Sequence, residues 1–482
     1  METRLNYIDG AWVPSLSGEY AVNYNPANAD EAVGRLPRSS PEDADRAVQA
    51  AHRALPGWRA ASGAARGEAL HKAALLLERQ ADEVAALITK EMGKTLAEAR
   101  LEALRGAAIL RYYASEGLRA TGEHIPASDG SSLLYTKRTP LGVVALITPW
   151  NFPVAIPLWK LAPALVYGNT VVLKPAENAG LTAAKLFELL AEAGVPSGAA
   201  NLVHGDGAAV GEALTAHPLV AGISFTGSNA VGRRIARAAS ERGAKYQLEM
   251  GGKNAVIVWE DADLERAADM VVSGAMKSAG QKCTATSKAI VASAVKERFT
   301  ELLLQRIAAI RVGDGMDPET YYGPLAAAKQ RDAVLRAIRR GVEEGAKLLC
   351  GGGAPSRPEL AGGYYVEPTL FDGVTADMSL AKEEIFGPVL ALMEARTLHE
   401  AIELANGTEY GLSAAIFTSS LQTAMTFAGR VEAGMIKVNA ETAGVEYQAP
   451  FGGLKQSSSH SREQGRAAIE FFTHTQTVSF SM

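Results

Sequence analysis

Gly142-Val143-Val144-Ala145-Leu146-Ile147 is the segment that decides the fold, because it is an uninterrupted apolar run of strand length. Similar short runs follow it, with helical patterns between them. Runs of this kind are typical of strands buried on both faces, and their alternation with helices indicates a parallel sheet covered by helices. We therefore expect an α/β fold. The further expected strands are 170–173, 200–203, 221–225 and 245–249, and the helices between them are 181–193, 207–216 and 229–240.

The segments before and after this alternation of strands and helices predict supporting helices and a projecting β ribbon. Ser40 and Pro41 are typical of a capped helix start, and helical patterns then run from about 64 to 116 with a break at Gly93. Asp129-Gly130 predicts a hairpin turn within 121–139. The alternating tail 471–480 predicts an edge strand, which would pair with another strand, so hairpin and tail are expected to meet in an oligomer.

Length and composition limit the class of protein. A chain of 482 residues exceeds one hydrophobic core, so we expect a second lobe, beginning near Gly252. The net charge of −5 gives no reason to expect a nucleic-acid partner. Two cysteines cannot form a disulfide framework, and neither a signal core nor a membrane-length apolar run is visible, so we expect a cytoplasmic protein without a membrane partner. The eight histidines lack zinc-site spacing, so no metal is expected.

Two loops follow expected strands, at the sheet edge where ligands of parallel sheets bind. Thr226 to Gly232 contains Gly227, and the following helix would offer free N–H groups to a pyrophosphate. Its glycine spacing matches neither the dinucleotide fingerprint nor a P-loop, so an ordinary tight turn is about as plausible. The second loop carries Lys174 and Glu177, which suit the hydroxyls of an adenosine ribose but also fit a surface pair.

Cys283 is one of two cysteines and lies in a loop of small polar residues opened by Gly280. A thiolate there would be a nucleophile if its surroundings lowered the pKa of the thiol, and Lys282 could contribute. The alternative is an inert, small apolar residue. The second cysteine, Cys350, is expected in the core.

Taken together, several motifs in family order resemble the aldehyde dehydrogenase superfamily, and the resemblance covers essentially the whole chain. Met250 departs from the usual leucine, a swap that conserves volume. The motifs are Thr148-Pro149-Trp150-Asn151-Phe152-Pro153, Lys174-Pro175-Ala176-Glu177, Phe225-Thr226-Gly227-Ser228, Glu249-Met250-Gly251-Gly252-Lys253, Gly280-Gln281-Lys282-Cys283 and Glu384-Ile385-Phe386-Gly387-Pro388.

The resemblance implies a catalytic set of four residues. Cys283 would attack the aldehyde carbon, and the Asn151 amide with the Cys283 backbone N–H would stabilise the oxyanion. Glu249 would activate the water that hydrolyses the thioester, whereas the alternative is an exposed acid at a strand end. Lys174 is counted both in this set and among the cofactor residues.

The resemblance also implies NAD as the cofactor, with NADP possible. Glu384 and Phe386 would hold the nicotinamide ribose and ring, and Lys174 and Glu177 the adenosine ribose. A carboxylate beside the 2′-hydroxyl would repel the phosphate of NADP, which favours NAD. The remaining expected cofactor residues are Ile147, Trp150, Gly207, Gly227, Ser228 and Gly232.

The family fold implies two Rossmann-type parallel-sheet lobes and a small β oligomerisation ribbon, in a homodimer or homotetramer. The expected division is an NAD(P)-binding domain at 1–120 and 141–251, a catalytic domain at 252–450, and the ribbon at 121–140 and 451–482.

Four segments are most similar to the 2-oxoglutarate semialdehyde (2,5-dioxopentanoate) dehydrogenase branch: 157–160, 281–287, 443–447 and 461–465. An acidic aldehyde implies a cation near its far end. Lys277 stands where semialdehyde-oxidising relatives often carry arginine, and Trp159 is a second expected substrate residue, whereas Lys160 is expected to be structural. The alternatives are a broad-range or aromatic aldehyde dehydrogenase and a non-catalytic relative.

Overall fold

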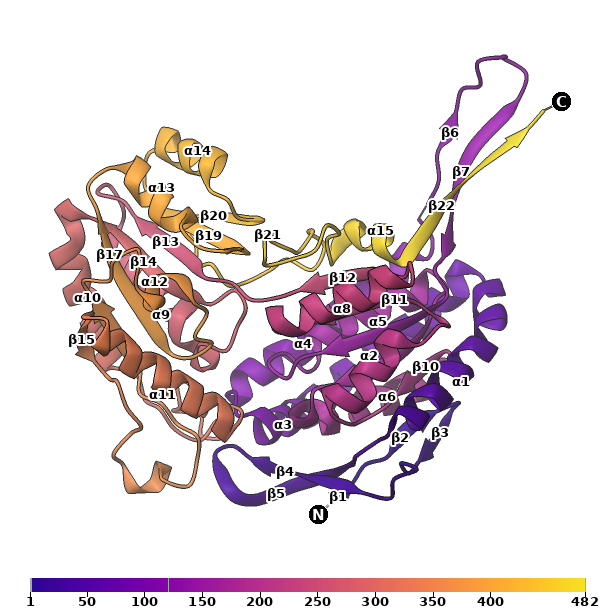
Figure 1. Cartoon of the computed structure of the whole chain (residues 1–482), viewed down its shortest axis with the longest axis horizontal. Helices are drawn as coiled ribbons and strands as arrows, with labels where there is room; N and C mark the ends of the chain where they lie inside the picture. The colour runs from indigo at the N-terminus through magenta and orange to yellow at the C-terminus, as the bar shows by residue number, and fades with distance from the viewer. Residues whose placement is uncertain (1, 120, 482) are drawn as a thin grey trace.

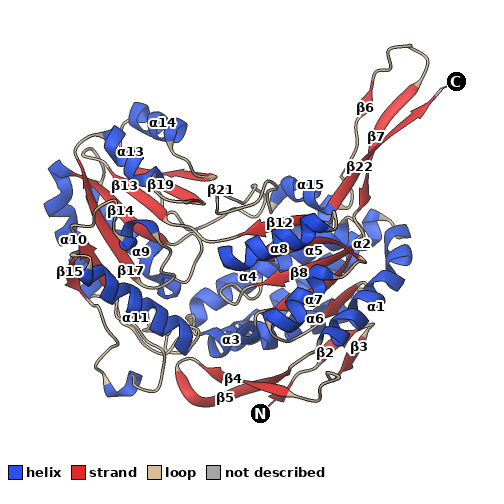
Figure 2. Cartoon of the chain, in the orientation of Figure 1, coloured by secondary structure: helices blue, strands red, loops and turns tan. Residues whose placement is uncertain are grey.

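The computed structural model describes residues 2–119 and 121–481 and has two lobes side by side, with a narrow ribbon projecting from one of them (Figure 1). Each lobe is built on a seven-stranded sheet with helices packed against it (Figure 2). The α/β fold expected from the alternation of strands and helices is therefore confirmed.

The sheet of the first lobe contains all five strands expected from the sequence, paired in parallel. Its central strand β8 is buried along its whole length and pairs with β9 and β11. Two short N-terminal strands extend the sheet in antiparallel pairing. The strand order is β12 (Lys245–Glu249), β11 (Val220–Thr226), β8 (Val143–Thr148), β9 (Thr170–Pro175), β10 (Ala200–Leu202), β2 (Asn6–Ile8) and β3 (Ala11–Val13).

Most helices of the first lobe follow the predicted pattern, but α5 and α15 were not predicted and two further segments differ. Gly93 ends α3 in the left-handed conformation, with φ 91°, as expected. A second break at Gln80, between α2 and α3, was not expected. The segment 207–216 begins as a π turn and becomes regular helix at α7. The helices are α1 (Pro41–Ala60), α2 (Gly63–Arg79), α3 (Ala81–Met92), α4 (Leu96–Glu116), α5 (Ala155–Val166), α6 (Gly180–Glu192), α7 (Glu212–Ala216), α8 (Asn229–Glu241) and α15 (Ala468–Phe472).

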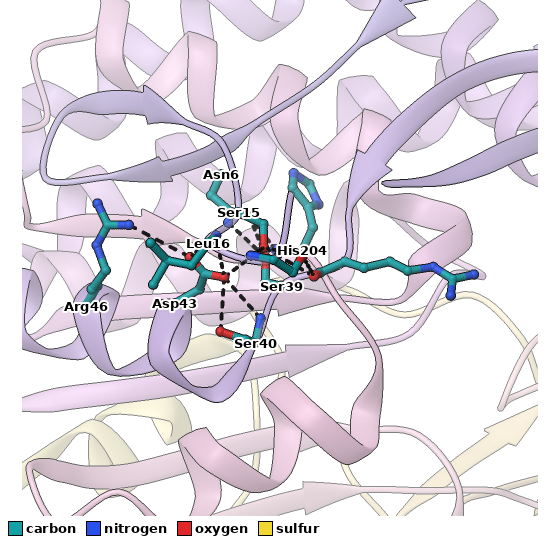
Figure 3. A network of polar contacts seen from close by, with 10 residues as sticks. Asn6, Ser15, Leu16, Ser39, Ser40, Asp43, Arg46 and His204 are labelled. Atoms are coloured by element: carbon teal, nitrogen blue, oxygen red, sulfur yellow. Dashed lines mark hydrogen bonds and ion pairs between the residues drawn. The ribbon is translucent and has the colours of Figure 1, made fainter. Parts of the chain in front are cut away.

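A buried polar network fixes the N-terminal segment to the start of α1 (Figure 3). The Asp43 carboxylate accepts hydrogen bonds from Ser15 Oγ at 2.9 Å and from the Ser40 N–H at 3.0 Å. Asn6 joins the same region, because its Oδ1 accepts from the His204 N–H at 2.9 Å. Residues 6–16 are thereby held beside the first sheet. The preceding and following strands, β1 (Glu2–Thr3), β4 (Tyr20–Asn25) and β5 (Asn28–Pro37), form a separate three-stranded sheet.

The second lobe repeats the design of the first, with six parallel strands and one antiparallel edge strand, β15. Cys350 lies on β15 and is partly buried, so the expectation of a core position holds only in part. The strand order is β15 (Lys347–Cys350), β16 (Thr369–Asp372), β17 (Val389–Ala395), β14 (Thr286–Ala292), β13 (Asn254–Val258), β19 (Ser413–Phe417) and β20 (Met435–Val438). The helices are α9 (Leu264–Met276), α10 (Lys296–Ala308), α11 (Ala328–Glu343), α12 (Ser379–Lys382), α13 (Leu398–Asn406) and α14 (Leu421–Arg430).

The projecting ribbon combines the expected hairpin with the C-terminal tail of the same chain. Strand β7 (Leu133–Pro140) lies between β6 (His124–Ile125) and β22 (Thr473–Phe480). The tail pairs with β7 over eight residues, from Thr473 opposite Pro140 to Phe480 opposite Leu133. The residues before the tail stay with the first lobe, where α15 packs against α5 and β12. A short antiparallel pair, β18 (Tyr410–Gly411) with β21 (Leu454–Lys455), completes the sheets.

Within residues 2–119 and 121–481, no helix has the length and the apolar composition that a membrane span requires. No cluster of three or more His, Cys, Asp or Glu side chains in the same ranges is placed to hold a metal ion.

Candidate active site

The loop that carries Cys283 is fixed by an unusual backbone turn. Ser278, Ala279 and Gly280 all have positive φ, at 55°, 52° and 69°. Two of them are not glycine, and such strain persists where the surrounding structure enforces it, often at functional sites. A Cβ atom on Gly280 would lie 2.1 Å from the carbonyl oxygen of Gly387, so glycine is required at this contact.

Side chains of the second lobe hold the loop on its other side. The Asn254 amide donates hydrogen bonds to the carbonyl oxygens of Cys283 and Ala285, both at 2.8 Å. The Thr442 hydroxyl donates to the Thr284 carbonyl oxygen at 2.8 Å. The half-buried Cys283 is therefore presented on a backbone that is anchored on both sides.

Asn151 lies just after β8 and connects the two lobes. Its Nδ2 donates to the carbonyl oxygen of Gln281, two residues before the nucleophile, at 3.0 Å. An amide nitrogen carries two hydrogens, so one remains for an oxyanion. Buried Lys94 supports this position, since its ammonium donates to the Asn151 carbonyl oxygen at 2.7 Å and pairs with Glu102 at 2.6 Å.

Glu249 ends β12 and is buried, so it is not the exposed strand-end acid of the alternative interpretation. Its Oε2 accepts a hydrogen bond from Ser458 Oγ at 2.6 Å. Ser458 Oγ itself accepts from the Gly453 N–H at 2.6 Å, which leaves its hydrogen for the carboxylate. The backbone at position 452 can come close to Glu249 because this residue is glycine: a Cβ there would lie 3.1 Å from Glu249 Oε1.

The pKa of the Cys283 thiol is shifted in the direction opposite to the one expected. Burial, together with the carboxylates of Glu384 and Glu249, raises the pKa of the Cys283 thiol to about 12. The backbone N–H groups of Cys283 and Thr284 oppose this rise. The expectation that Lys282 lowers this pKa is wrong, because the net shift is upward and Lys282 is not among its causes. The thiol must therefore lose its proton to a base when it reacts.

Glu249 fits the role of that base. Burial raises its pKa well above the ordinary value of a glutamate, and the nearby Glu463 adds to the rise. The Ser458 hydrogen bond and the charges of Lys160 and Arg462 oppose it. A carboxylate with a raised pKa is a stronger base, so the ionised form of Glu249 accepts a proton more readily than an ordinary glutamate does.

One cavity of about 260 Å³ connects the nucleophile with the glycine loop after β11. Pro149, Ile156, Thr226 and Gln330 also line it. Cys283 is therefore not sealed in the core, and the expected catalytic and cofactor residues open onto the same space. Those that line it are Cys283, Asn151, Trp150, Gly227, Ser228, Glu384 and Phe386.

Glu384 and Phe386 form the second-lobe wall of this cavity. Glu384 accepts a hydrogen bond from the Gly252 N–H at 3.1 Å, and a Cβ on Gly251 would lie 2.2 Å from its Oε2. Burial raises the pKa of Glu384 to about 7. Phe386 has φ 57° and its ring meets Trp150 edge-on, with centroids 5.6 Å apart.

A second cavity, of about 270 Å³, continues along the first lobe and contains two more expected cofactor residues, Ile147 and Gly207. Its lining includes the apolar side chains of Val231 and Ile235, as a flat heterocycle such as adenine requires. The two cavities share no lining residue, and each offers backbone and apolar surface on the first lobe.

Lys174 and Glu177 lie at the outer side of this site. Lys174 is buried beside Gly211, and burial lowers its pKa against the opposing charges of Glu177 and Asp206. Lys174 does not line the cavity that contains Cys283, and its expected catalytic and cofactor roles both stay predictions. The exposed Glu177 lines a neighbouring cleft between the lobes together with Trp150.

The two glycines of the loop after β11 have different surroundings. Gly227 donates its N–H to the Glu249 carbonyl oxygen at 3.0 Å and lies over the Phe225 ring. A Cβ on Gly232 would lie 2.5 Å from the sulfur of Met250. Gly232 therefore allows α8 to pack against the strand end that carries Glu249, rather than facing the cavity.

The two expected substrate residues, Trp159 and Lys277, differ in exposure and in their surroundings. Trp159 is buried on α5 and its ring packs against Phe451, with centroids 5.4 Å apart. Lys277 lies at the end of α9 and is exposed. Lys160, expected to be structural, is buried and pairs with Glu463.

Several residues of the site were missed by the sequence analysis. Glu249 is approached by three residues from a segment more than 200 positions away: Ser458, Arg462 and Glu463. No pattern in the local sequence predicts that contact. Gln281 is a further omission: its side chain accepts from the Ala326 N–H at 3.0 Å and so supports the loop. The serine cluster at 457–459 was the one available signal, since a hydroxyl run near a motif can supply hydrogen bonds.

The fold and the cavity around Cys283 are consistent with a nicotinamide-linked oxidoreductase, and the chain belongs to the aldehyde dehydrogenase family, whose model matches residues 12–478. The chain is 54% identical over 476 residues to the alpha-ketoglutaric semialdehyde dehydrogenase of Bacillus subtilis, covering 99% of this chain and 98% of the relative. It is 43% identical to the 2,5-dioxopentanoate dehydrogenase of Saccharolobus solfataricus, covering 97% of each.

Solved structures agree with this assignment. The betaine aldehyde dehydrogenase of Staphylococcus aureus, crystallised with NAD+, superposes with a TM-score of 0.97 at 34% identity. That match covers 99% of this chain and 94% of the solved chain. The two-lobe fold with its ribbon is thus that of the family, and the chain is an oxidoreductase that acts on aldehydes.

Proposed function

We propose that the protein oxidises 2-oxoglutarate semialdehyde (2,5-dioxopentanoate) to 2-oxoglutarate with NAD. The observation that carries the chemistry is one open cavity lined by Cys283 and Asn151, with the buried Glu249 immediately before Met250 and Gly251, which also line it. The names of two full-length relatives, at 54% and 43% identity, support this choice of substrate.

The residues of the site can perform each step. The Cys283 thiol loses its proton, with Glu249 as acceptor, and its sulfur bonds to the aldehyde carbon. The resulting oxyanion is stabilised by Asn151 Nδ2 and the Cys283 N–H. When bound, the nicotinamide supplies the acceptor for the hydride that leaves this carbon. Glu249 releases the thiol proton to solvent and then takes a proton from water as the water oxygen attacks the thioester. The carbon–sulfur bond breaks, the carboxylic acid leaves, and the proton on Glu249 returns to the sulfur as the thiol reforms.

NAD fits the first-lobe surface that runs from Gly207 to Gly227. The apolar cavity suits the adenine, and Lys174 and Glu177 suit the adenosine ribose. The exposed carboxylate of Glu177 favours NAD over NADP, because it would repel a 2′-phosphate. The NAD+ complex of the betaine aldehyde dehydrogenase relative is consistent with this choice.

A panel of aldehydes tests the proposal. Values of kcat/KM, measured from NADH absorbance, are expected to be highest for 2-oxoglutarate semialdehyde, lower for succinic and glutaric semialdehydes, and lowest for benzaldehyde. Equal values across the panel would instead indicate a broad-range enzyme.

We further propose the assembly and the division into domains. The NAD-binding domain comprises 1–120 and 141–251, the catalytic domain 252–450, and the oligomerisation ribbon 121–140 with β22; residues 451–472 are left outside the ribbon, because α15 packs against α5 and β12. The ribbon has little core of its own, which supports contact with another subunit in a homodimer or homotetramer; sedimentation velocity tests this. Two unpaired cysteines are consistent with a cytoplasmic location.

A further inference from the structure

Arg105, on α4, is a half-buried cation whose hydrogen-bonding capacity is not met. Its Nη2 is buried and has no hydrogen-bond partner within 2–119 and 121–481. Burial lowers the pKa of its guanidinium, but an arginine stays charged in proteins, so the group remains a donor. Buried donors normally have acceptors, and one without an acceptor in the chain points to a ligand.

Helix α4 is fixed next to the catalytic amide. Glu102, one turn before Arg105, accepts from the N–H groups of Val154 and Ala155 at 2.8 Å and 3.0 Å, where α5 begins. Gly106, the next residue after Arg105, lies against Leu158, which a Cβ would approach to 2.9 Å. Arg105 therefore stands beside the helix that starts just after Asn151.

The segment 442–452 forms a wall on this side of the nucleophile. It begins at Thr442, hydrogen-bonded to the residue after Cys283, and ends at Gly452, in contact with Glu249. It therefore spans the distance from the nucleophile to the base. Glu384 and Phe386 line the cavity that contains Cys283, and we infer that the aldehyde approaches from the opposite side, along this segment.

Arg105 faces the middle of this wall. Glu446, Glu102 and Tyr447 act electrostatically on its guanidinium and oppose the effect of burial on its pKa, and Arg105 in turn adds to the burial that lowers the pKa of Lys437. The Tyr447 ring packs edge-on against Tyr112, two turns further along α4, with centroids 5.9 Å apart. The unpaired donor thus lies between α4 and the segment that joins the nucleophile to the base.

We propose that Arg105 binds the distal carboxylate of the aldehyde substrate. This deepens the proposed function and rests on it. A guanidinium can bind a carboxylate through two parallel hydrogen bonds, which a lysine cannot do. Lys277, the candidate from the sequence, is exposed at the end of α9. Lys282 is adjacent to the reacting sulfur, and the carboxylates of Glu441 and Glu98 already oppose the effect of burial on its pKa.

The test compares an acidic with a neutral aldehyde in Arg105→Met, which keeps the length of the side chain and removes its charge. The ratio of kcat/KM for 2-oxoglutarate semialdehyde over pentanal should fall roughly 10- to 100-fold, mainly through KM, as expected for a lost charge-assisted pair. Arg105→Lys should fall between wild type and Arg105→Met. Arg111→Met, on the exposed face of the same helix, should leave the ratio unchanged.

An unchanged ratio in Arg105→Met would overturn the proposal, as would an equal loss for both aldehydes in a variant with the thermal midpoint of the wild type. A second measurement does not depend on the proposed substrate: inhibition of pentanal oxidation by glutarate should weaken at least tenfold in Arg105→Met. If wild type does not oxidise the semialdehyde but loses glutarate inhibition in the variant, the proposed function fails and the carboxylate site stands. Unchanged glutarate inhibition overturns the site in either case.

Discussion

The cofactor side and the proposed aldehyde side of Cys283 differ in the chemical groups that form them. On the cofactor side the contacts come from backbone and apolar surface, such as Gly227, Gly251 and the cavity around Val231. On the side where we propose that the aldehyde binds, the groups are charged side chains: Glu446 and Glu102 act on Arg105, and Glu441 and Glu98 act on Lys282. A ligand held by backbone leaves a glycine motif in the sequence, whereas a ligand held by side chains from several elements does not.

Each side also brings one buried carboxylate close enough to raise the pKa of the thiol, and these two carboxylates differ in their partners. Glu384 accepts from a backbone N–H and lies near Lys253, whereas Glu249 accepts from the Ser458 hydroxyl and lies near Glu463. We expect the first to affect cofactor binding and the second to affect proton transfer. Four substitutions test this contrast.

The largest effect is expected for Cys283→Ala, which removes the group shared by both sides. Steady-state NADH formation should fall by a factor of about 10⁴ or more, because the covalent route is lost. Cys350→Ala is the matched control and should retain wild-type activity, since this residue lies on the edge strand of the second lobe. Comparable activity in Cys283→Ala would remove the nucleophile from the mechanism.

Glu249→Gln should separate the two halves of the reaction. A burst of NADH, at most one per active site, should be followed by turnover slowed by about 10² to 10⁴, because the thioester lacks its general base. Rapid mixing with absorbance detection measures both phases. Because burial raises the pKa of Glu249, the wild-type deacylation rate should rise with pH as this carboxylate ionises. Turnover without a slow phase in the variant would assign the base elsewhere.

Glu384→Gln should act on the cofactor side, weakening NAD binding by about tenfold through the loss of one charge-assisted contact. Isothermal titration measures the dissociation constant directly, and the KM for the aldehyde should change much less. A variant that binds NAD normally but has an altered aldehyde KM would contradict the division between the two sides.

Ser458→Ala should give the smallest effect and the most specific one. The hydroxyl stabilises the ionised form of Glu249, so its loss should raise the pKa of this carboxylate further. A base acts in its ionised form, and the rising limb of deacylation against pH should therefore move to higher pH, by about one unit or less. The NADH burst should keep its amplitude. A shift to lower pH, or no shift, would show that Ser458 does not position the base.

A feature of the fold or of the site was predictable from the sequence when it depends on residues that are neighbours along the chain. The five strands of the first sheet and the helix end at Gly93 follow from periodicity and backbone preference, and the structure confirms them. The break at Gln80 was missed because glutamine is a good helix former and nothing nearby marks an end. The raised pKa of Cys283 was missed because it arises from burial and from two carboxylates remote in sequence.

The sequence by itself determined the α/β alternation, the positions of Cys283 and Glu249 within recognisable motifs, and the family, because these are encoded in short runs of neighbouring residues. The tertiary structure decided which side chains surround those two groups. Ser458 reaches Glu249, Nη2 of Arg105 has no acceptor within residues 2–119 and 121–481, and Lys174 lies beside Gly211 and outside the lining of the cavity that contains Cys283. These outcomes depend on packing between distant elements, and contacts of that kind have no periodicity along the chain.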